Sequence, residues 1–269
     1  MYFTKEDGMN IGVIGRGFVG DALYKSFLKR EQKIISYDKY KNIGKFSDIL
    51  DSDILFLCLP TPSSCNGSFN LSALTDTLTL LRDNYYNGLA VVKSTVEPGT
   101  TRAFCKKYKL NIVHNPEFLT ARSNYQDFDS QDHIVLGKVE DSVLFDKLVS
   151  LYVDLYKDAK ISICSSEESE AMKLFCNCFY AAKVQIFNEL YFVCKKMNID
   201  FENVKKMMFL NNWINPKHTD VPGPDGMLSY GGACFPKDTE ALNFLMKKLK
   251  SPNKILESVI LERDLMREK

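Results

Sequence analysis

The stretch Ile11–Gly20, IGVIGRGFVG, constrains the fold more than any other part of the chain. Its glycines Gly15, Gly17 and Gly20 form a GxGxxG pattern between an apolar run, which predicts a buried strand, and an amphipathic run, which predicts a helix. In such a pattern one glycine makes the tight turn, one lets a pyrophosphate approach the backbone, and one permits close helix packing. The pattern therefore predicts the first strand–turn–helix unit of a dinucleotide-binding domain.

A carboxylate follows the second predicted strand. The run KIISYD ends at Asp38, where an acidic side chain can accept hydrogen bonds from the adenosine ribose of a dinucleotide. Because its charge would repel a 2′-phosphate, NAD is expected as the cofactor, and Lys39 and Lys41 nearby keep NADP open as the alternative. The predicted cofactor contacts of this region are Gly15, Gly17, Phe18, Val19, Gly20 and Asp38.

The first half of the chain alternates short apolar runs with amphipathic stretches, which is typical of an α/β fold of parallel strands joined by helices. Strands are predicted over Ile11–Ile14, Lys33–Tyr37, Ile54–Leu59, Ala90–Lys93, Asn111–His114, Ile134–Leu136 and Lys160–Cys164. Helices are predicted over Val19–Lys29, Ser72–Asn84, Thr100–Tyr108 and Asp141–Asp154. Together they predict a doubly wound Rossmann domain over residues 1–164.

The second half, residues 165–269, is predicted to be an all-helical domain. After Cys164 a run that opens with Ser and Glu capping signals keeps helical spacing to about Lys196, which predicts one helix of about thirty residues. Further helices are predicted over Phe201–Asn211, Thr239–Lys250 and Asn253–Glu268, with a Gly- and Pro-rich loop over Asn215–Pro236. The long helix has apolar residues around much of its circumference, so an oligomer is expected, with cover by the C-terminal helices as the alternative.

Charge and cysteine content exclude several classes of protein. With 35 Lys and Arg against 34 Asp and Glu, the net charge of +1 provides no field that would recruit nucleic acid or an anionic membrane. The longest stretch without a charge, Ile54–Thr75, is interrupted by prolines and polar residues, so no transmembrane helix is predicted. The N-terminus lacks the apolar core of a signal peptide and the eight cysteines include no CxxC pair, so a cytoplasmic protein without a bound metal is expected.

Several side chains suit oxidation chemistry. Cys234 lies in a Gly- and Pro-rich segment just before a predicted helix, which Asp238 is expected to cap, so backbone amides there would stabilise a thiolate. Lys173 and Asn177 are four residues apart and therefore project from one face of the long helix. The ordinary alternatives are a buried structural cysteine and the solvent-exposed face of a helix.

Five motifs follow one another along the chain. They are CLPTP (Cys58–Pro62), KSTVEPGTT (Lys93–Thr101), HNPEFL (His114–Leu119), ESEAMKLFCNCFYAAKVQIFNE (168–189) and GGACFPKD (Gly231–Asp238). In this combination, which covers nearly the whole chain, the sequence resembles the nucleotide-sugar dehydrogenase family, which includes UDP-glucose 6-dehydrogenases and GDP-mannose dehydrogenases. Thr95 and Glu117, from two of these motifs, also follow predicted strands, at the edge where open α/β sheets place their ligands.

The resemblance implies a role for each of these residues. Cys234 would be the nucleophile that captures an aldehyde, and Asp238 would assist it. Lys173 and Asn177 would handle the proton and the developing oxyanion. Thr95 would position a water, and Glu117 would be the base for hydrolysis. The side chains expected to line the nicotinamide are Pro60, Thr61 and Thr95, and the expected substrate contacts are Glu117, Phe118, Leu119, Lys173, Asn177, Gly231 and Lys237.

The resemblance implies an NAD-dependent, four-electron oxidation of a UDP-sugar primary alcohol to the uronic acid, with UDP-glucose as the first candidate substrate. It also implies a homodimer formed through the helical region. Two alternatives stay open, a two-electron β-hydroxyacid dehydrogenase, which has no need of Cys234, and a non-catalytic NAD-binding protein.

The chain departs from the family at Ala121, where a second glutamate is usual, and at Trp213, which replaces an arginine. Full members continue through a second nucleotide-binding domain after the position of Asp238, so a short form of the family is expected.

Overall fold

The computed structural model describes residues 9–120 and 122–267, which divide into two compact units. Unit 1 consists of the described residues up to Pro62 together with Asn70–Lys173, and unit 2 consists of Ser63–Phe69 together with the described residues from Leu174 onward. The division falls inside the longest helix rather than at its start, where the sequence places a domain boundary after Cys164. That boundary stays a prediction.

Unit 1 is built on a seven-stranded sheet with the strand order β2-β1-β3-β4-β5-β6-β7. The strands are β1 (Ile11–Ile14), β2 (Ile34–Tyr37), β3 (Ile54–Leu57), β4 (Leu89–Val92), β5 (Asn111–His114), β6 (His133–Lys138) and β7 (Lys160–Ser165). Every residue of β1, β3 and β4 is buried, which is why these strands read as unbroken apolar runs. All seven predicted strands are confirmed, with ends shifted by at most a few residues.

The order of the strands reverses at β1. The chain first pairs β2 with one side of β1 and then pairs β3 with the other side, and both strands run parallel to β1. In open α/β sheets, ligands bind outside the carboxyl ends of the strands at the point where the order reverses. The glycine fingerprint follows β1 directly and therefore lies at this point.

The expectation of parallel strands is wrong at β6. This strand runs antiparallel to β5, with His114 paired to Gly137, and β7 then runs parallel to β6. A parallel neighbour needs a crossover that returns the chain to the opposite edge of the sheet. The connection from β5 to β6 carries one helix of 6 residues, α4 (Asn124–Asp129), and leads into a strand that starts at the edge where β5 ends.

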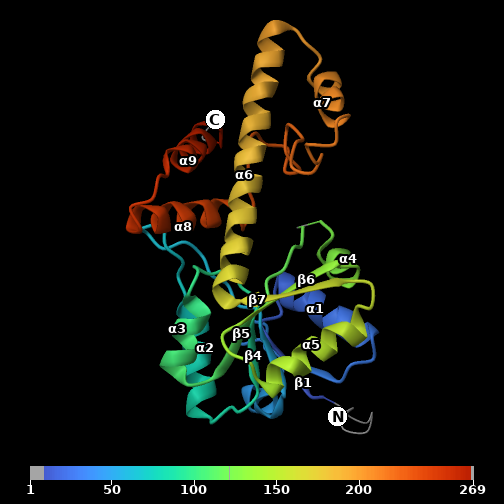
Figure 1. Cartoon of the computed structure of the whole chain (residues 1–269), viewed down its shortest axis with the longest axis vertical. Coiled ribbons are helices and arrows are strands. Elements are labelled where there is room, and N and C mark those ends of the chain that lie inside the picture. Colours follow the sequence, from blue (N-terminus) through green and yellow to red (C-terminus); the bar gives the residue numbers. More distant parts are fainter. Residues whose placement is uncertain (1–8, 121, 268–269) are drawn as a thin grey trace. The chain divides into compact units, whose positions relative to one another are not determined.

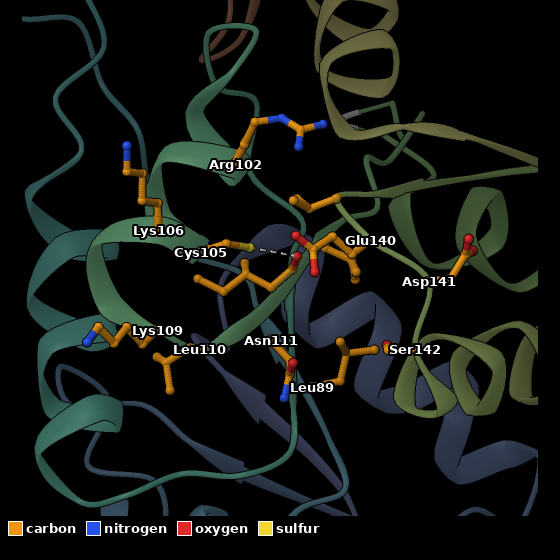
Figure 2. A pocket seen from close by; sticks show the side chains of 13 residues that line it. Leu89, Arg102, Cys105, Lys106, Lys109, Leu110, Asn111, Glu140, Asp141 and Ser142 are labelled. Atoms are coloured by element: carbon orange, nitrogen blue, oxygen red, sulfur yellow. Dashed lines mark hydrogen bonds between the residues drawn. The ribbon is translucent and has the colours of Figure 1, made fainter.

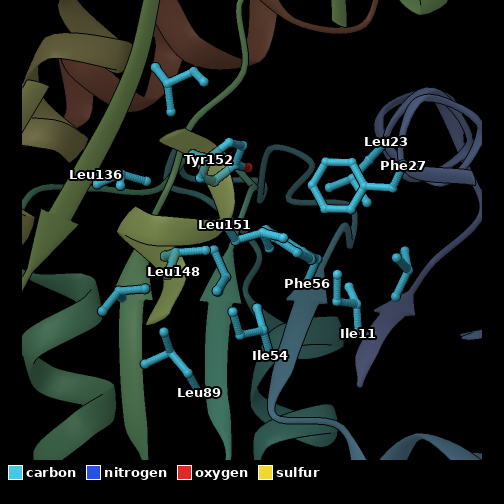
Figure 3. Packing of buried hydrophobic residues seen from close by; sticks show 14 of the residues in the cluster. Ile11, Leu23, Phe27, Ile54, Phe56, Leu89, Leu136, Leu148, Leu151 and Tyr152 are labelled. Atoms are coloured by element: carbon cyan, nitrogen blue, oxygen red, sulfur yellow. The ribbon is translucent and has the colours of Figure 1, made fainter. Parts of the chain in front are cut away.

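Helices cover both faces of this sheet, as Figure 1 shows. On one face lie α1 (Phe18–Lys29), α4 and α5 (Val143–Leu155), and on the other lie the 3-10 helix η1 (Phe46–Asp51), α2 (Ser72–Asp83) and α3 (Thr100–Tyr108). Figure 3 shows the apolar core on the face covered by α1, α4 and α5. There the ring of Phe27 in α1 packs edge-on against that of Phe56 in β3, with ring centroids 5.6 Å apart. The sequence did not predict η1 and α4, because six residues are too few for a helical period to be visible.

Unit 2 is helical. It contains most of α6 (Ser166–Met197), which begins in unit 1, together with α7 (Phe201–Phe209), α8 (Phe235–Lys248) and α9 (Lys254–Arg267). The 32 residues of α6 confirm the predicted long helix. Helix α8 begins at Phe235 rather than at the predicted Thr239, because Pro236 occupies its first turn, where a helix needs no N–H donor. Glu268, the predicted end of the last helix, lies outside the described residues.

Apolar side chains pack the helices of unit 2 against one another. Phe187 and Cys194 of α6 pack against Phe201 of α7, and Ala181 of α6 packs with Tyr230 and Val259. Asp200 caps α7 by accepting a hydrogen bond from the Asn203 amide at 3.1 Å. Among the helices that the structure describes, each is too short or too polar to cross a bilayer.

Candidate functional site

The turn between β1 and α1 has the shape that a pyrophosphate requires. Gly15 has a φ of 90°, and a Cβ atom at Gly20 would lie 1.8 Å from the Gly15 carbonyl oxygen, so the close approach of α1 to this turn depends on Gly20. A Cβ atom at Gly17 would meet no atom within 4 Å. Gly17 is also the N-cap of α1 and contributes no side chain to the amides of the first turn. The open space over Gly17 and these amides fit a dinucleotide phosphate.

Asp38 is held against the same turn by backbone donors. Its Oδ2 atom accepts a hydrogen bond from the Arg16 amide at 2.7 Å, and its Oδ1 atom accepts from the amides of Tyr40 and Lys41, both at 2.9 Å. Burial alone would raise the pKa of Asp38, but these backbone donors and the charge of Lys41 outweigh it and hold the pKa below its usual value. A carboxylate oxygen has two lone pairs, so Oδ2 retains capacity for a ribose hydroxyl.

The loops after β3 and β4 are joined by hydrogen bonds. The Thr61 hydroxyl donates to the Thr95 carbonyl oxygen at 2.9 Å, and the Ser94 hydroxyl donates to the Leu59 carbonyl oxygen at 2.5 Å. Thr61 and Thr95 are buried, whereas Pro60 is exposed. The structure therefore brings together the loops that carry the three side chains expected at the nicotinamide.

Glu117 and Lys173 form a buried ion pair within unit 1. The Lys173 Nζ atom lies 3.2 Å from Glu117 Oε1, and the other carboxylate oxygen accepts a hydrogen bond from the Leu119 amide at 2.6 Å. The Lys173 ammonium also lies 5.3 Å from the centroid of the Phe118 ring. The expected substrate contacts from HNPEFL and from the start of α6 are thus in contact with one another.

Sequence reasoning missed the supporting role of Lys93. Its side chain is fully buried and donates to Asn115 Oδ1 at 2.9 Å and to the Pro116 carbonyl oxygen at 3.3 Å, directly before Glu117 in the chain. Burial lowers the pKa of Lys93 to about 8. The available signal was a lysine at the carboxyl end of an apolar strand, followed one strand later by an asparagine.

In unit 2, Asp238 lies at the centre of a second group. It has no exposed surface, and its carboxylate accepts a hydrogen bond from the Asn177 amide group at 2.6 Å and pairs with Lys237 at 2.6 Å. The expectation that Asp238 caps α8 is wrong, because its own amide donates to the Cys234 carbonyl oxygen at 3.0 Å inside the first turn. Cys234 is the N-cap residue, since α8 begins earlier than the Gly- and Pro-rich sequence indicates.

Cys234 is exposed at the N-terminal end of a helix of 14 residues. The positive end of a helix dipole favours the thiolate form of a cysteine. Gly231, three residues earlier, packs against Arg267, because a Cβ atom there would lie 2.4 Å from the Arg267 Nη1 atom. Trp213 is largely exposed, and Ala121 lies outside the described residues.

The predicted site residues thus fall into two groups, one in each unit. Unit 1 holds Gly15, Gly17, Phe18, Val19, Gly20, Asp38, Pro60, Thr61, Thr95, Glu117, Phe118, Leu119 and Lys173, and unit 2 holds Asn177, Gly231, Cys234, Lys237 and Asp238. Within the described part of the chain, no group of three or more His, Cys, Asp or Glu side chains is arranged to hold a metal ion.

A pocket of about 610 Å³ lies elsewhere in unit 1 (Figure 2). It is lined by the end of α3, the start of β5 and the loop after β6, and the Cys105 thiol there donates to the Ile112 carbonyl oxygen at 3.3 Å. Leu89 and Asn111, which line it, are the first residues of β4 and β5. The pocket is therefore at the amino ends of these strands, away from the edge where such sheets bind their ligands.

Comparison with known proteins decides the family. Residues 40–159 match the NAD binding domain of the UDP-glucose/GDP-mannose dehydrogenase family, and residues 167–262 match its central domain. The chain belongs to this family. It carries the family's NAD binding domain in unit 1, where the glycine turn and Asp38 fit that cofactor.

Relatives within the UDP-glucose/GDP-mannose dehydrogenase family are similar over most of this chain. A UDP-glucose 6-dehydrogenase of Haloferax volcanii is 29% identical over 283 residues, covering 87% of this chain and 64% of that protein. A UDP-glucose 6-dehydrogenase of Rickettsia bellii is 31% identical over 220 residues, covering 79% of this chain and 49% of that protein. The chain therefore spans between 49% and 64% of the length of these curated relatives.

The fold is also that of a solved family structure. A UDP-glucose dehydrogenase from Pyrobaculum islandicum matches with a TM-score of 0.83 and 24% identity, covering 98% of this chain and 70% of that one. At this identity the likeness shows the fold, which confirms the predicted Rossmann domain followed by a helical region on one long helix.

Proposed function

We propose that this family member oxidises the primary alcohol of a nucleotide sugar to the carboxylate in two NAD-dependent steps, with UDP-glucose as the first substrate to test. The relatives named as UDP-glucose 6-dehydrogenases support the substrate class. When bound, the nicotinamide cofactor accepts one hydride in each oxidation, so two equivalents are reduced for each sugar.

In the first oxidation the hydroxyl group loses its proton and the carbon that bears it loses a hydride, which gives an aldehyde. We assign to Lys173 and Asn177 the stabilisation of the charge that develops on its oxygen. Each of these side chains is held by a carboxylate, Lys173 by Glu117 at 3.2 Å and Asn177 by Asp238 at 2.6 Å. Such restraint favours catalysis, because donors that are already in place need no reorganisation during the reaction.

In the second oxidation we assign Cys234 as the nucleophile. Its thiolate adds to the aldehyde carbon, the oxygen takes up a proton, and a thiohemiacetal results. Loss of a second hydride and of the hydroxyl proton leaves a thioester. A water held near Thr95 then gives a proton to Glu117 and attacks the thioester carbon, the C–S bond breaks, and the carboxylate leaves with Cys234 restored.

The observation that carries this proposal is the first turn of α8. It has an exposed cysteine at its N-cap and, one turn later, a fully buried aspartate bonded to an asparagine of α6. A cysteine that only fills the core would be buried among apolar side chains. Cys234 instead occupies the helix end that favours a thiolate, so the geometry supports covalent chemistry over simple hydride transfer.

The test counts NADH at completion with limiting UDP-glucose and excess NAD. Two NADH for each sugar are expected, and Cys234→Ser should reduce this ratio to one or less. Cys65→Ser is the matched control, because Cys65 is also an exposed cysteine of unit 2, and it should keep the ratio at two. A wild-type ratio of one contradicts the second oxidation, and no NADH from UDP-glucose, UDP-N-acetylhexosamines or GDP-mannose contradicts the proposal as a whole.

We also propose that the chain forms a homodimer through α6. Five apolar side chains on this helix are each more than half exposed, namely Phe175, Phe179, Ile186, Val193 and Met197. Their spacings of four and seven residues place them along one stripe of the helix. A second copy of the same stripe is self-complementary, which is the geometry of a two-fold interface.

A further inference from the structure

The first turns of α6 carry a buried carboxylate that the proposed reaction does not use. Glu170 has no exposed surface, and its two oxygens accept hydrogen bonds from the amides of Gly99 at 2.6 Å and Thr101 at 2.7 Å. Gly99 is the N-cap of α3, has a φ of 93° and provides no capping side chain. Glu170 therefore supplies from α6 the carboxylate that a cap residue would ordinarily supply to α3.

His114 makes a second connection from α6 to the same loop. Its Nδ1 atom lies 2.8 Å from the Ser169 hydroxyl, and its Nε2 atom lies 3.3 Å from the Ser94 carbonyl oxygen. Burial lowers the pKa of His114 to about 3, so the ring is neutral at neutral pH. Because a carbonyl oxygen can only accept, Nε2 donates to Ser94 and Nδ1 accepts from Ser169.

These contacts attach both ends of the loop between β4 and α3 to one helix. Ser94 is attached through His114 to Ser169, and Gly99 is attached to Glu170. The loop carries Thr95, and one turn further along α6 is Lys173, which pairs with Glu117. All of these residues belong to unit 1.

We infer that Glu170 is a positioning residue, which with Ser169 and His114 fixes Lys173 relative to Thr95 and Glu117. This inference rests on the proposed function, since it gives Lys173 and Thr95 their roles. Glu170 is suited to hold rather than to react, because each oxygen accepts a hydrogen bond from a backbone amide and the side chain has no exposed surface. A displacement of about 1 Å in a catalytic group can reduce a rate by about a hundredfold, so a displaced α6 would affect turnover.

The variant that tests this inference is Glu170→Gln. Glutamine has the same shape, but its NH₂ group would face one of the two backbone amides from which Glu170 accepts a hydrogen bond. Two donors would then face each other, and that hydrogen bond would be lost. Glu167→Gln is the matched control, because Glu167 also joins α6 to α3, through an ion pair with Arg102 at a more exposed position. Ser169→Ala is a second variant, which removes one hydroxyl from the connection through His114.

The first measurement is the acetylation rate of Lys173 by limiting acetic anhydride, followed by mass spectrometry. Lys173 is almost fully buried in the wild type, so we expect its labelling to rise severalfold in Glu170→Gln, to rise less in Ser169→Ala and to be unchanged in Glu167→Gln. Unchanged labelling in Glu170→Gln would overturn the inference. This readout requires no turnover, so it decides the matter even if no sugar is oxidised and the proposed function fails.

The second measurement is the rate of NADH formation divided by the concentration of NAD-binding sites. Calorimetric titration with NAD gives this concentration, so unfolded protein does not contribute to it. We expect kcat of Glu170→Gln to fall about tenfold or more, with the KM for NAD within about twofold of the wild type. The NAD turn around Gly17 is not part of these contacts, which is why its affinity should persist. Equal kcat values for wild type and Glu170→Gln would overturn the positioning role.

Discussion

His114 should make the folded protein sensitive to mild acid. Its ring has no exposed surface at the end of β5, and burial lowers its pKa from the usual 6.5 to about 3. In the unfolded chain the same ring takes up a proton near its usual pKa. The folded state therefore binds fewer protons than the unfolded state over this interval, and the stability that His114 contributes is lost as the pH falls below about 6.5.

The magnitude follows from the size of the shift. Each pKa unit corresponds to about 1.4 kcal/mol, so a fall from about pH 6.5 to pH 5 removes about 2 kcal/mol from the free energy of unfolding. Full protonation at still lower pH would remove about 5 kcal/mol. No reduction for solvent screening applies, because the ring is completely buried.

The assay is urea unfolding at pH 7.5 and pH 5 of the wild type, His114→Gln and a control, His133→Gln. His133 lies on the neighbouring strand β6, where its ring is partly exposed and bonded to Ser162. Glu170 acts in the opposite direction, since burial raises its pKa to about 7, but it is present in all three proteins and cancels in the differences. Between pH 7.5 and pH 5 the free energy of unfolding of the wild type and of the control should fall by about 2 kcal/mol more than that of His114→Gln. Equal losses in all three would refute the reasoning.

Three further predictions concern the cofactor turn and the dimer. Gly20→Ala places a Cβ atom 1.8 Å from the Gly15 carbonyl oxygen and should lower the free energy of unfolding by about 1–3 kcal/mol, measured in urea, whereas Gly17→Ala should keep its stability and lose NAD binding by calorimetry. Asp38→Asn should lower the affinity for NAD about tenfold and reduce the ratio of the affinities for NAD and NADP. Unchanged affinities for both cofactors would contradict the ribose contact of Asp38. Phe179→Glu should shift the protein from dimer to monomer in sedimentation equilibrium, with Val153→Glu on α5 as a control that should leave the mass unchanged.

The strands of unit 1 could be predicted because burial on both faces leaves a simple signal. In β1, β3 and β4 every residue is buried, so each strand is a continuous apolar run bounded by polar or turn residues. The direction of β6 could not be predicted in the same way, since direction depends on the path of the connection rather than on strand composition. The dinucleotide turn was visible because only glycine satisfies its geometry at Gly15 and Gly20.

The start of α8 was predicted one turn after its position in the structure. Proline and glycine around Cys234 indicate a loop, but proline is also favoured in the first turn of a helix. Moving the helix start from Thr239 to Phe235 changes the role of Asp238 from a cap to a buried partner of Asn177. It also places Cys234 at the N-cap, where the helix itself contributes to the chemistry proposed for the thiol.

Glu170 and Ser169 lie inside a motif that the sequence already singles out, yet their contacts could not be deduced from it. Helix α3 begins with a glycine cap that lacks a side chain, and nothing near Gly99 in the chain compensates for this. The compensating carboxylate is about seventy residues away, at Glu170, so it is found only when the fold brings α6 to the start of α3. The motif therefore contains both residues to which we assign substrate contacts, such as Lys173, and residues that bond to the backbone of a neighbouring helix, such as Glu170. The two kinds can be separated by burial together with hydrogen-bond partners, because a carboxylate such as Glu170, which accepts backbone amides and has no exposed surface, is not accessible to a substrate.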